Sequence, residues 1–319
     1  MRLPMLPLLV CALSCAGNRP AETAPPPPPE PSAPTESAEA SEPAAEPETS
    51  AETGSSVSTP SVGDVAARVA SANARLAASA GGALVWRAIE AHGGLEAWLG
   101  SGPLQFRFAY QPAGRPAIDT FQVVDPWSAR ARQQVAPQRT AEFGWDGQRA
   151  WVQPPDAKLP TNPRFWSLTP YYFVGMPFVL GDPGVRFEQL ADASFEDESF
   201  DIVKATFEPG TGDAPGDHYV LYLDKESGRL RAVRYVVSYP GFYPDGGHGA
   251  EKLMSYDGEL AVGDIIIAAS HRTFTFDEAT GTPGEKVTDV TVSDARFRAD
   301  IAPDYFLAPA GARIIEGWK

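Results

Sequence analysis

The spacing of apolar residues changes near residue 104, and this change most limits how the chain can fold. Before it, apolar residues recur with helical spacing over 64–80, 83–92 and 95–99. After it, residues 104–110 alternate apolar and polar side chains, as a strand with one buried face does. Further strands are predicted at 118–124, 128–134, 139–145, 149–153, 200–207, 218–224, 230–239, 251–256, 265–276 and 285–298. About ten or eleven strands without intervening helices predict an α+β fold with a curved antiparallel sheet, a half-open β-barrel.

Local signals set the expected ends of these elements. Asp64 is predicted to cap the first helix, and Gly81-Gly82 predicts a break before the second. Gly93-Gly94 predicts a left-handed end to the second helix, and Asp146-Gly147 predicts a tight turn between two strands.

Residues 163–180 interrupt the strand pattern with an aromatic block. Because Pro163, Pro170 and Pro177 exclude one long helix or a central strand, we expect short helices that plug the concave face of the sheet. Six of its side chains are candidates for lining an apolar ligand cavity: Trp166, Tyr171, Tyr172, Phe173, Met176 and Phe178. The alternative is that they fill the core, which is the commoner role of large aromatic residues.

A second aromatic segment, residues 239–244, contains prolines and a glycine that predict a turn. Exposed rings on a turn are typical of a recognition patch or the rim of a cavity. We therefore single out Phe242 and Tyr243 as candidate recognition residues.

The start of the chain has the order of a secretion signal. Residues 3–13 are apolar almost throughout, Arg2 precedes them, and Ser14-Cys15 follows. This order is typical of a bacterial lipoprotein signal peptide, residues 1–14, with Cys15 as the lipidated residue. The alternative is an ordinary cleaved signal with an incidental cysteine.

Residues 16–60 consist largely of Pro, Ala, Glu, Ser and Thr. Such a composition predicts a disordered, acidic tether that acts as a passive spacer or, alternatively, as a binding segment. The expected division of the chain is a signal peptide (1–14), a tether (15–61) and one folded domain (62–319).

Charge and cysteine usage exclude several functions. The formal net charge of −15 argues against a nucleic-acid partner and against electrostatic docking on anionic lipid. Membrane attachment is therefore expected through acyl chains on Cys15. Since the two cysteines, Cys11 and Cys15, both lie in the leader, the folded domain is expected to contain no disulfide, thiol nucleophile or cysteine metal site.

The sequence carries no GxSxG, HExxH, P-loop or dinucleotide motif. Its four histidines fall in different predicted elements: His92, His218, His248 and His271. We considered His248 as a metal ligand, Asp217-His218 as an acid–base pair and residues 196–198 as a calcium site. A helix-end role for His92 and a solvated loop at 196–198 are the simpler interpretations. We predict no catalytic residue, metal or cofactor.

Short motifs follow one another between residues 83 and 306. They are residues 88–94 with Trp98, 144–147 with Trp151, 176–180 with 182–185, 219–224 and 302–306. In this order they resemble an uncharacterised branch of the LolA/LolB-like superfamily of periplasmic lipoprotein carriers and receptors. The resemblance implies a half-open barrel, with an internal helical plug, that holds acyl chains. Resemblance to known bacterial lipoproteins also implies that Ala16, following Cys15, is compatible with sorting to the outer membrane.

Two classes of function follow. The first is a non-enzymatic lipoprotein of the cell envelope whose half-barrel binds an apolar ligand, either a lipid or an acylated protein. The second is an envelope protein–protein interaction module with a filled core and its binding surface on residues 239–244. A hydrolase is a distant third.

Overall fold

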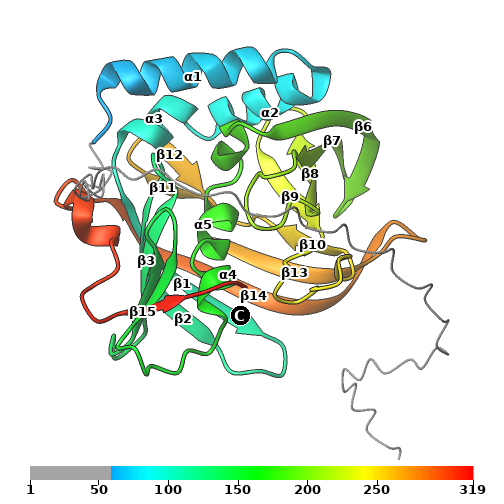
Figure 1. Ribbon diagram of the computed structural model, residues 1–319. Helices are drawn as coiled ribbons and strands as arrows, with labels where there is room; N and C mark the ends of the chain where they lie inside the picture. Colours follow the sequence, from blue (N-terminus) through cyan, green and yellow to red (C-terminus); the bar gives the residue numbers. More distant parts are fainter. Residues whose placement is uncertain (1–58, 319) are drawn as a thin grey trace, which may run out of the picture. The chain divides into compact units, whose positions relative to one another are not determined.

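A computed structural model describes residues 59–318 (Figure 1). The predicted signal peptide, the lipidated Cys15 and the tether up to residue 58 lie outside the described residues. The division at residues 14 and 61 therefore stays a prediction. Within 59–318, no helix combines the length and the apolar character that a membrane crossing needs.

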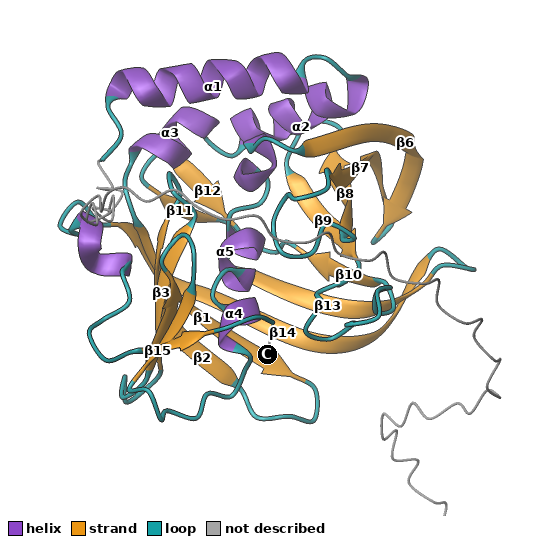
Figure 2. Cartoon of the chain, in the orientation of Figure 1, coloured by secondary structure: helices purple, strands orange, loops and turns teal. Residues whose placement is uncertain are grey.

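Three helices open the described chain and lie together over one end of the sheet (Figure 2). They are α1 (Val62–Leu76), α2 (Ala80–Ala91) and α3 (Leu95–Gly100). The cap of α1 differs from the prediction: Ser61 is the N-cap residue, and Asp64 lies in the first turn. The Ser61 hydroxyl accepts a hydrogen bond from the Asp64 amide, while the Asp64 carboxylate accepts one from the Ser61 amide. This reciprocal pair satisfies two amides that the helix itself leaves free.

The predicted break at Gly81-Gly82 is wrong, because both glycines lie in the first turn of α2. A Cβ atom on Gly81 would stand 2.9 Å from the amide nitrogen of Gln189 on a neighbouring strand. Glycine is needed here for close helix–strand approach, so it does not mark a loop. The end of α2 is as predicted: His92 is the C-cap residue and Gly93 has a φ of +111°.

Thirteen strands form one open antiparallel sheet in the order β15-β5-β4-β3-β2-β1-β14-β13-β10-β9-β8-β7-β6. The first half contains β1 (Leu104–Pro112), β2 (Ile118–Asp125), β3 (Arg130–Val135), β4 (Glu142–Trp145) and β5 (Ala150–Gln153). The second contains β6 (Val185–Phe195), β7 (Glu198–Phe207), β8 (His218–Asp224), β9 (Leu230–Tyr235), β10 (Lys252–Ser255), β13 (Ser270–Asp277) and β14 (Thr282–Phe297). The last strand, β15 (Arg313–Ile315), pairs with β5 and forms the outer edge of the first half. The predicted α+β class with a curved, unclosed antiparallel sheet is confirmed.

The strand predictions failed in two ways. The single strand expected over 265–276 is divided between β12 (Ile265–Ile267), which pairs with β11 (Leu260–Val262) in a separate hairpin, and β13. Strands β6, β11 and β15 were not predicted. Strand β6 is an edge of the sheet, and most of its residues are exposed or half-exposed, so its sequence lacks a clear alternation.

The aromatic block forms the predicted short helices. They are α4 (Pro163–Trp166), α5 (Thr169–Val174) and the 3-10 turn η1 (Phe178–Gly181). The sheet curves around α4 and α5 (Figure 1), and one apolar cluster joins this segment to α1–α3 and to inward side chains of both halves of the sheet. We call residues 163–181 the plug. A smaller cluster, which includes Ile202, Val220 and Tyr222, lies on the opposite face of β7 and β8.

Candidate ligand cavity

A cavity of about 520 Å³ lies against the plug. The plug and the ends of β7–β9 supply most of its apolar wall: Phe165, Leu168, Tyr172, Phe173, Met176, Val179, Leu180, Phe207, Tyr219, Tyr235, Val237 and Tyr239. The turns after β2 and β4 and the loop between β7 and β8 complete it. Its volume lies within the range of roughly 300–1,000 Å³ that is usual for sites of small ligands.

The structure divides the six residues that we singled out in the plug. Tyr172, Phe173 and Met176 line the cavity. The other three are buried away from it: Trp166, Tyr171 and Phe178. The Phe178 ring stacks on Trp98 of α3 with 4.9 Å between the centroids, and Tyr171 lies at 6.1 Å from the same indole. One face of the plug thus borders a cavity and the other fills the core, while ligand binding by the first face stays a prediction.

The second aromatic segment lies beside the cavity. Phe242 is half exposed, and its ring lies 4.9 Å from Phe165 and 5.2 Å from Tyr239, both of which line the cavity. Tyr243 is partly buried and does not line the cavity. Phe242 is therefore placed at the rim, while a recognition role for either residue stays a prediction.

One arginine of the lining, Arg68 on α1, is held by three contacts. It donates hydrogen bonds to Asp182 (2.7 Å) and to the carbonyl oxygen of Trp127 (2.6 Å), and its guanidinium lies 4.9 Å from the centre of the Trp127 ring. Burial raises the pKa of Asp182, and the adjacent guanidinium opposes that shift. Sequence reasoning missed this arrangement, because its members come from α1, the β2–β3 turn and the residue directly after the plug.

A second arginine repeats the pattern across the plug. Arg164 on α4 donates to Asp213 in the β7–β8 loop (2.5 Å) and lies 3.5 Å from the centre of the Trp145 ring. Burial raises the pKa of Asp213, again against the effect of its arginine. This ion pair joins the plug to the loop that borders the cavity.

Besides these pairs, the polar side chains of the lining include a third carboxylate, several phenols and the hydroxyls of Ser128, Thr169 and Thr211. Asp217 accepts hydrogen bonds from the Ser238 amide (2.6 Å) and hydroxyl (2.8 Å), and burial raises its pKa. Burial also raises the pKa of Tyr172 and of Tyr239 to about 12. These phenols are therefore uncharged at neutral pH and offer hydroxyl groups beside an apolar wall.

Of the remaining candidates of the sequence, His218 and His248 lie side by side, with 6.3 Å between their ring centroids. Asp217 bonds to Ser238, whereas His218 lies 3.6 Å from the carboxylate of Glu251, so the two neighbours have different partners. His248 is exposed on its loop. Within residues 59–318, no group of three or more His, Cys, Asp or Glu side chains is placed to hold a metal ion.

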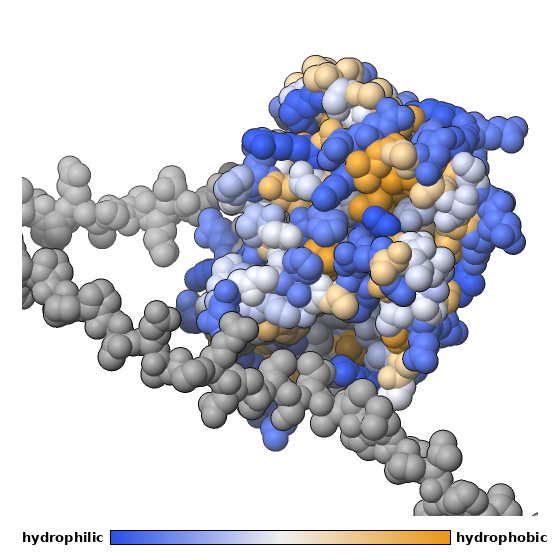
Figure 3. Space-filling view, turned by 90° about the vertical axis from the view of Figure 1, so that its right-hand side faces the viewer, coloured by the Kyte–Doolittle hydropathy of each residue, from blue (hydrophilic) through white to orange (hydrophobic). Residues whose placement is uncertain are grey.

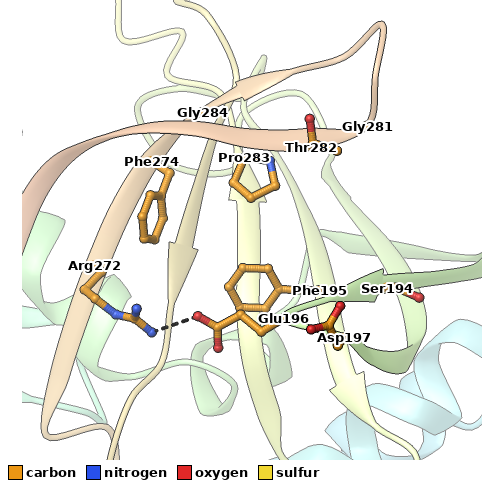
Figure 4. A pocket seen from close by; sticks show the side chains of 10 residues that line it. All are labelled: Ser194, Phe195, Glu196, Asp197, Arg272, Phe274, Gly281, Thr282, Pro283 and Gly284. Atoms are coloured by element: carbon orange, nitrogen blue, oxygen red, sulfur yellow. Dashed lines mark hydrogen bonds and ion pairs between the residues drawn. The ribbon is translucent and has the colours of Figure 1, made fainter.

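A second hollow, of about 480 Å³, lies between the β6–β7 turn and the β13–β14 hairpin (Figure 4). Glu196, from the acidic stretch that we considered as a calcium site, pairs there with Arg272 at 3.2 Å. Arg272 also pairs with Asp257 at 2.8 Å. The side of the molecule that carries β6–β8 is mostly hydrophilic, with a few gathered apolar residues (Figure 3). We therefore place the candidate site in the cavity against the plug.

Comparisons with known proteins bear on the fold alone. No protein-family model matches the chain, and no curated protein does. Among solved structures, a LolA superfamily protein from Nitrosomonas europaea is similar over 71% of this chain and 96% of its own, with 12% identity and a TM-score of 0.45. A putative outer membrane lipoprotein-sorting protein domain from Vibrio parahaemolyticus matches over 65% and 90%, with 14% identity and a TM-score of 0.41.

A DUF1329 family protein from Desulfovibrio piger is also similar, over 70% of this chain and 95% of its own, with 11% identity and a TM-score of 0.45. The similar structures thus include a member of the superfamily that the sequence motifs resemble.

Proposed function

We propose that the domain is a non-enzymatic binding module that takes one apolar ligand, a lipid or the acyl group of an acylated protein, into the cavity against the plug. The observation that carries this proposal is a cavity of about 520 Å³ with a largely aromatic wall, made by Tyr172, Phe173 and Met176 of the plug and by Tyr219 and Tyr235 of the sheet. A wall of aromatic and thioether side chains adapts to a flexible chain and offers it a large apolar contact area.

We further propose that the module works in the bacterial cell envelope, most simply at the outer membrane, where acylated Cys15 holds it. The support is the order of the leader, in which an apolar stretch ends at Cys15. The acidic residues 16–60 would then separate the cavity from the lipid surface.

The proposal is tested on residues 16–319, exported behind an ordinary cleavable signal peptide and purified without detergent. Mass spectrometry of an organic extract is expected to find about one lipid per protein. Phe173→Asp places a charge in the wall and is expected to remove most of that lipid, because an unpaired buried carboxylate is costly.

Phe121→Asp makes the same change on the outer face of β2, where the ring lies 3.9 Å from the Arg139 guanidinium and does not line the cavity. This control variant is expected to keep its lipid. A folded Phe173→Asp variant with the lipid content of the parent, or a parent without lipid that also fails to bind a hydrophobic dye, would count against the proposal.

The half-exposed ring of Phe242 favours the second candidate, a module that binds a protein partner through residues 239–244. The double variant Phe242→Ser, Tyr243→Ser separates the two functions. It is expected to keep its lipid if the cavity is the site, and to lose only partner binding if the loop is the site.

A further inference from the structure

Among the charged side chains that line the cavity, carboxylates outnumber arginines by one. The lining contains two arginines and three aspartates: Arg68, Arg164, Asp182, Asp213 and Asp217. Arg68 pairs with Asp182, and Arg164 pairs with Asp213. The third carboxylate, Asp217, is left with the Ser238 amide and hydroxyl as its hydrogen-bond donors.

Neither arginine is available to a ligand without the loss of existing contacts. Arg68 would have to leave a carboxylate and a backbone carbonyl, and Arg164 would have to leave Asp213 and the face of Trp145. A carboxylate or phosphate of a ligand would therefore enter a partly desolvated site whose cations are already paired and whose spare charge is negative. Burying an unpaired anion there is strongly unfavourable.

An uncharged hydrogen-bonding group meets a better environment. The hydroxyls of Tyr172, Tyr219 and Tyr235 belong to residues of the wall, and burial raises the pKa of all three phenols. They can donate to an amide, ester or alcohol oxygen, and they can accept from the N–H of an amide or the O–H of an alcohol. Such a group pays no penalty for the burial of a full charge.

On the basis of the proposed function, we propose that the cavity selects uncharged lipids, such as fatty amides, alcohols and esters, and rejects fatty acid anions and anionic phospholipids. The selection arises from the prior pairing of Arg68 and Arg164 and from the spare carboxylate of Asp217.

One lysine near the cavity would favour an anionic ligand, contrary to this proposal. Lys252 on β10 lies opposite Tyr235 in the sheet, on the same face as the buried Met254. It does not line the cavity, and it forms no ion pair among residues 59–318. An anionic ligand that reached past Tyr235 would find its charge partner there, so the experiment includes this residue.

The experiment compares two ligands that differ in charge but share one acyl chain, oleate and oleamide. Residues 16–319, freed of endogenous lipid, are loaded with the uncharged fluorescent probe N-phenyl-1-naphthylamine at pH 8. Oleamide is expected to displace the probe at a concentration at least about tenfold lower than oleate, a difference of about 1.4 kcal/mol.

Asp213→Asn is expected to reverse part of this preference, because it frees the Arg164 guanidinium for the ligand. The ratio of oleate affinity to oleamide affinity is expected to rise about tenfold. Glu208→Gln is the matched control: it removes a carboxylate from the same connection, but Glu208 pairs with the exposed Arg186 and does not line the cavity. This control variant is expected to keep the parental ratio.

The outcomes separate the two proposals. If the probe does not bind the parent at all, the proposed function fails and the selectivity fails with it. If the probe binds but oleate competes as well as oleamide, the cavity stands and the selectivity is overturned. Loss of that oleate competition in Lys252→Met would then assign the carboxylate to Lys252. Tightest competition by oleylamine would also overturn the proposal, in favour of a cationic ligand at Asp217.

Discussion

The two faces of the plug have the same kind of side chain and opposite surroundings. On one face, Tyr171 and Phe178 are almost fully buried and stack on Trp98. On the other, Tyr172 and Phe173 border the cavity. Neighbours in sequence such as Tyr171 and Tyr172 thus belong to different environments, because a helix turns each successive side chain by about 100°.

The comparison shows what composition alone cannot tell about an aromatic segment. The buried face has partners on α3, so its rings are fixed by close packing. The cavity face borders open volume, although one of its rings, Phe173, also lies 5.4 Å from the Tyr235 ring. The first face should therefore determine stability, and the second should determine what is bound.

The largest expected effect is on the buried face. Phe178→Ala removes a ring stacked on Trp98 and is expected to lower the free energy of unfolding by about 3–5 kcal/mol. Phe173→Ala is expected to cost less than half as much, because the cavity already adjoins that ring. Urea unfolding of lipid-free protein measures both losses. Equal losses would contradict the proposed difference in packing between the two faces of the plug.

A smaller effect is expected from a titratable group buried in the sheet. His271 on β13 is fully buried, and burial lowers its pKa to about 4. The unfolded chain binds this proton near pH 6.5, so the contribution is complete above pH 6.5 and is lost as the pH falls toward 4. The loss is on the order of 3 kcal/mol.

His271→Gln removes the titration, so its unfolding free energy is expected to fall less steeply than that of the parent between pH 6.5 and pH 4. Parallel curves for the two proteins would show that His271 is reached by solvent protons in the folded state. Urea unfolding at a series of pH values gives both curves.

The smallest effect is expected at the rim. Phe242 is half exposed, so Phe242→Ala is expected to change the free energy of unfolding by less than about 1 kcal/mol. The same urea titration measures it. A loss comparable with that of Phe178→Ala would mean that the Phe242 ring belongs to the core and not to the rim of the cavity.

Strands with one buried and one exposed face were predictable from the sequence. The alternation at 104–110 corresponds to β1, whose Leu104, Phe106 and Phe108 are buried against the core. Strand β6 escaped prediction because it is an edge strand with little burial on either face. Gly81 was misread because the close approach of the Gln189 backbone, which requires glycine, is a tertiary contact.

The candidate site was predictable only as a segment. Proline and aromatic composition located the plug, but its helices are too short for periodicity to show which side faces the cavity. The ion pairs that border the cavity join Arg68 to Asp182 and Arg164 to Asp213, which lie 114 and 49 residues apart. No local pattern connects such distant positions.

The last segment of the described chain has a consequence for synthesis. Strand β15 completes the sheet beside β5, and the Arg313 guanidinium donates to a carbonyl 158 residues earlier. The Trp318 carbonyl accepts hydrogen bonds from Asn162, the N-cap of α4, and from Tyr239 of the cavity wall. On a nascent chain, the β5 edge therefore has no partner strand, and Asn162 at the start of the plug has no Trp318 carbonyl to bond, until residues 313–318 have been synthesised. During that interval the unpaired β5 edge is open to wrong pairing with other strands.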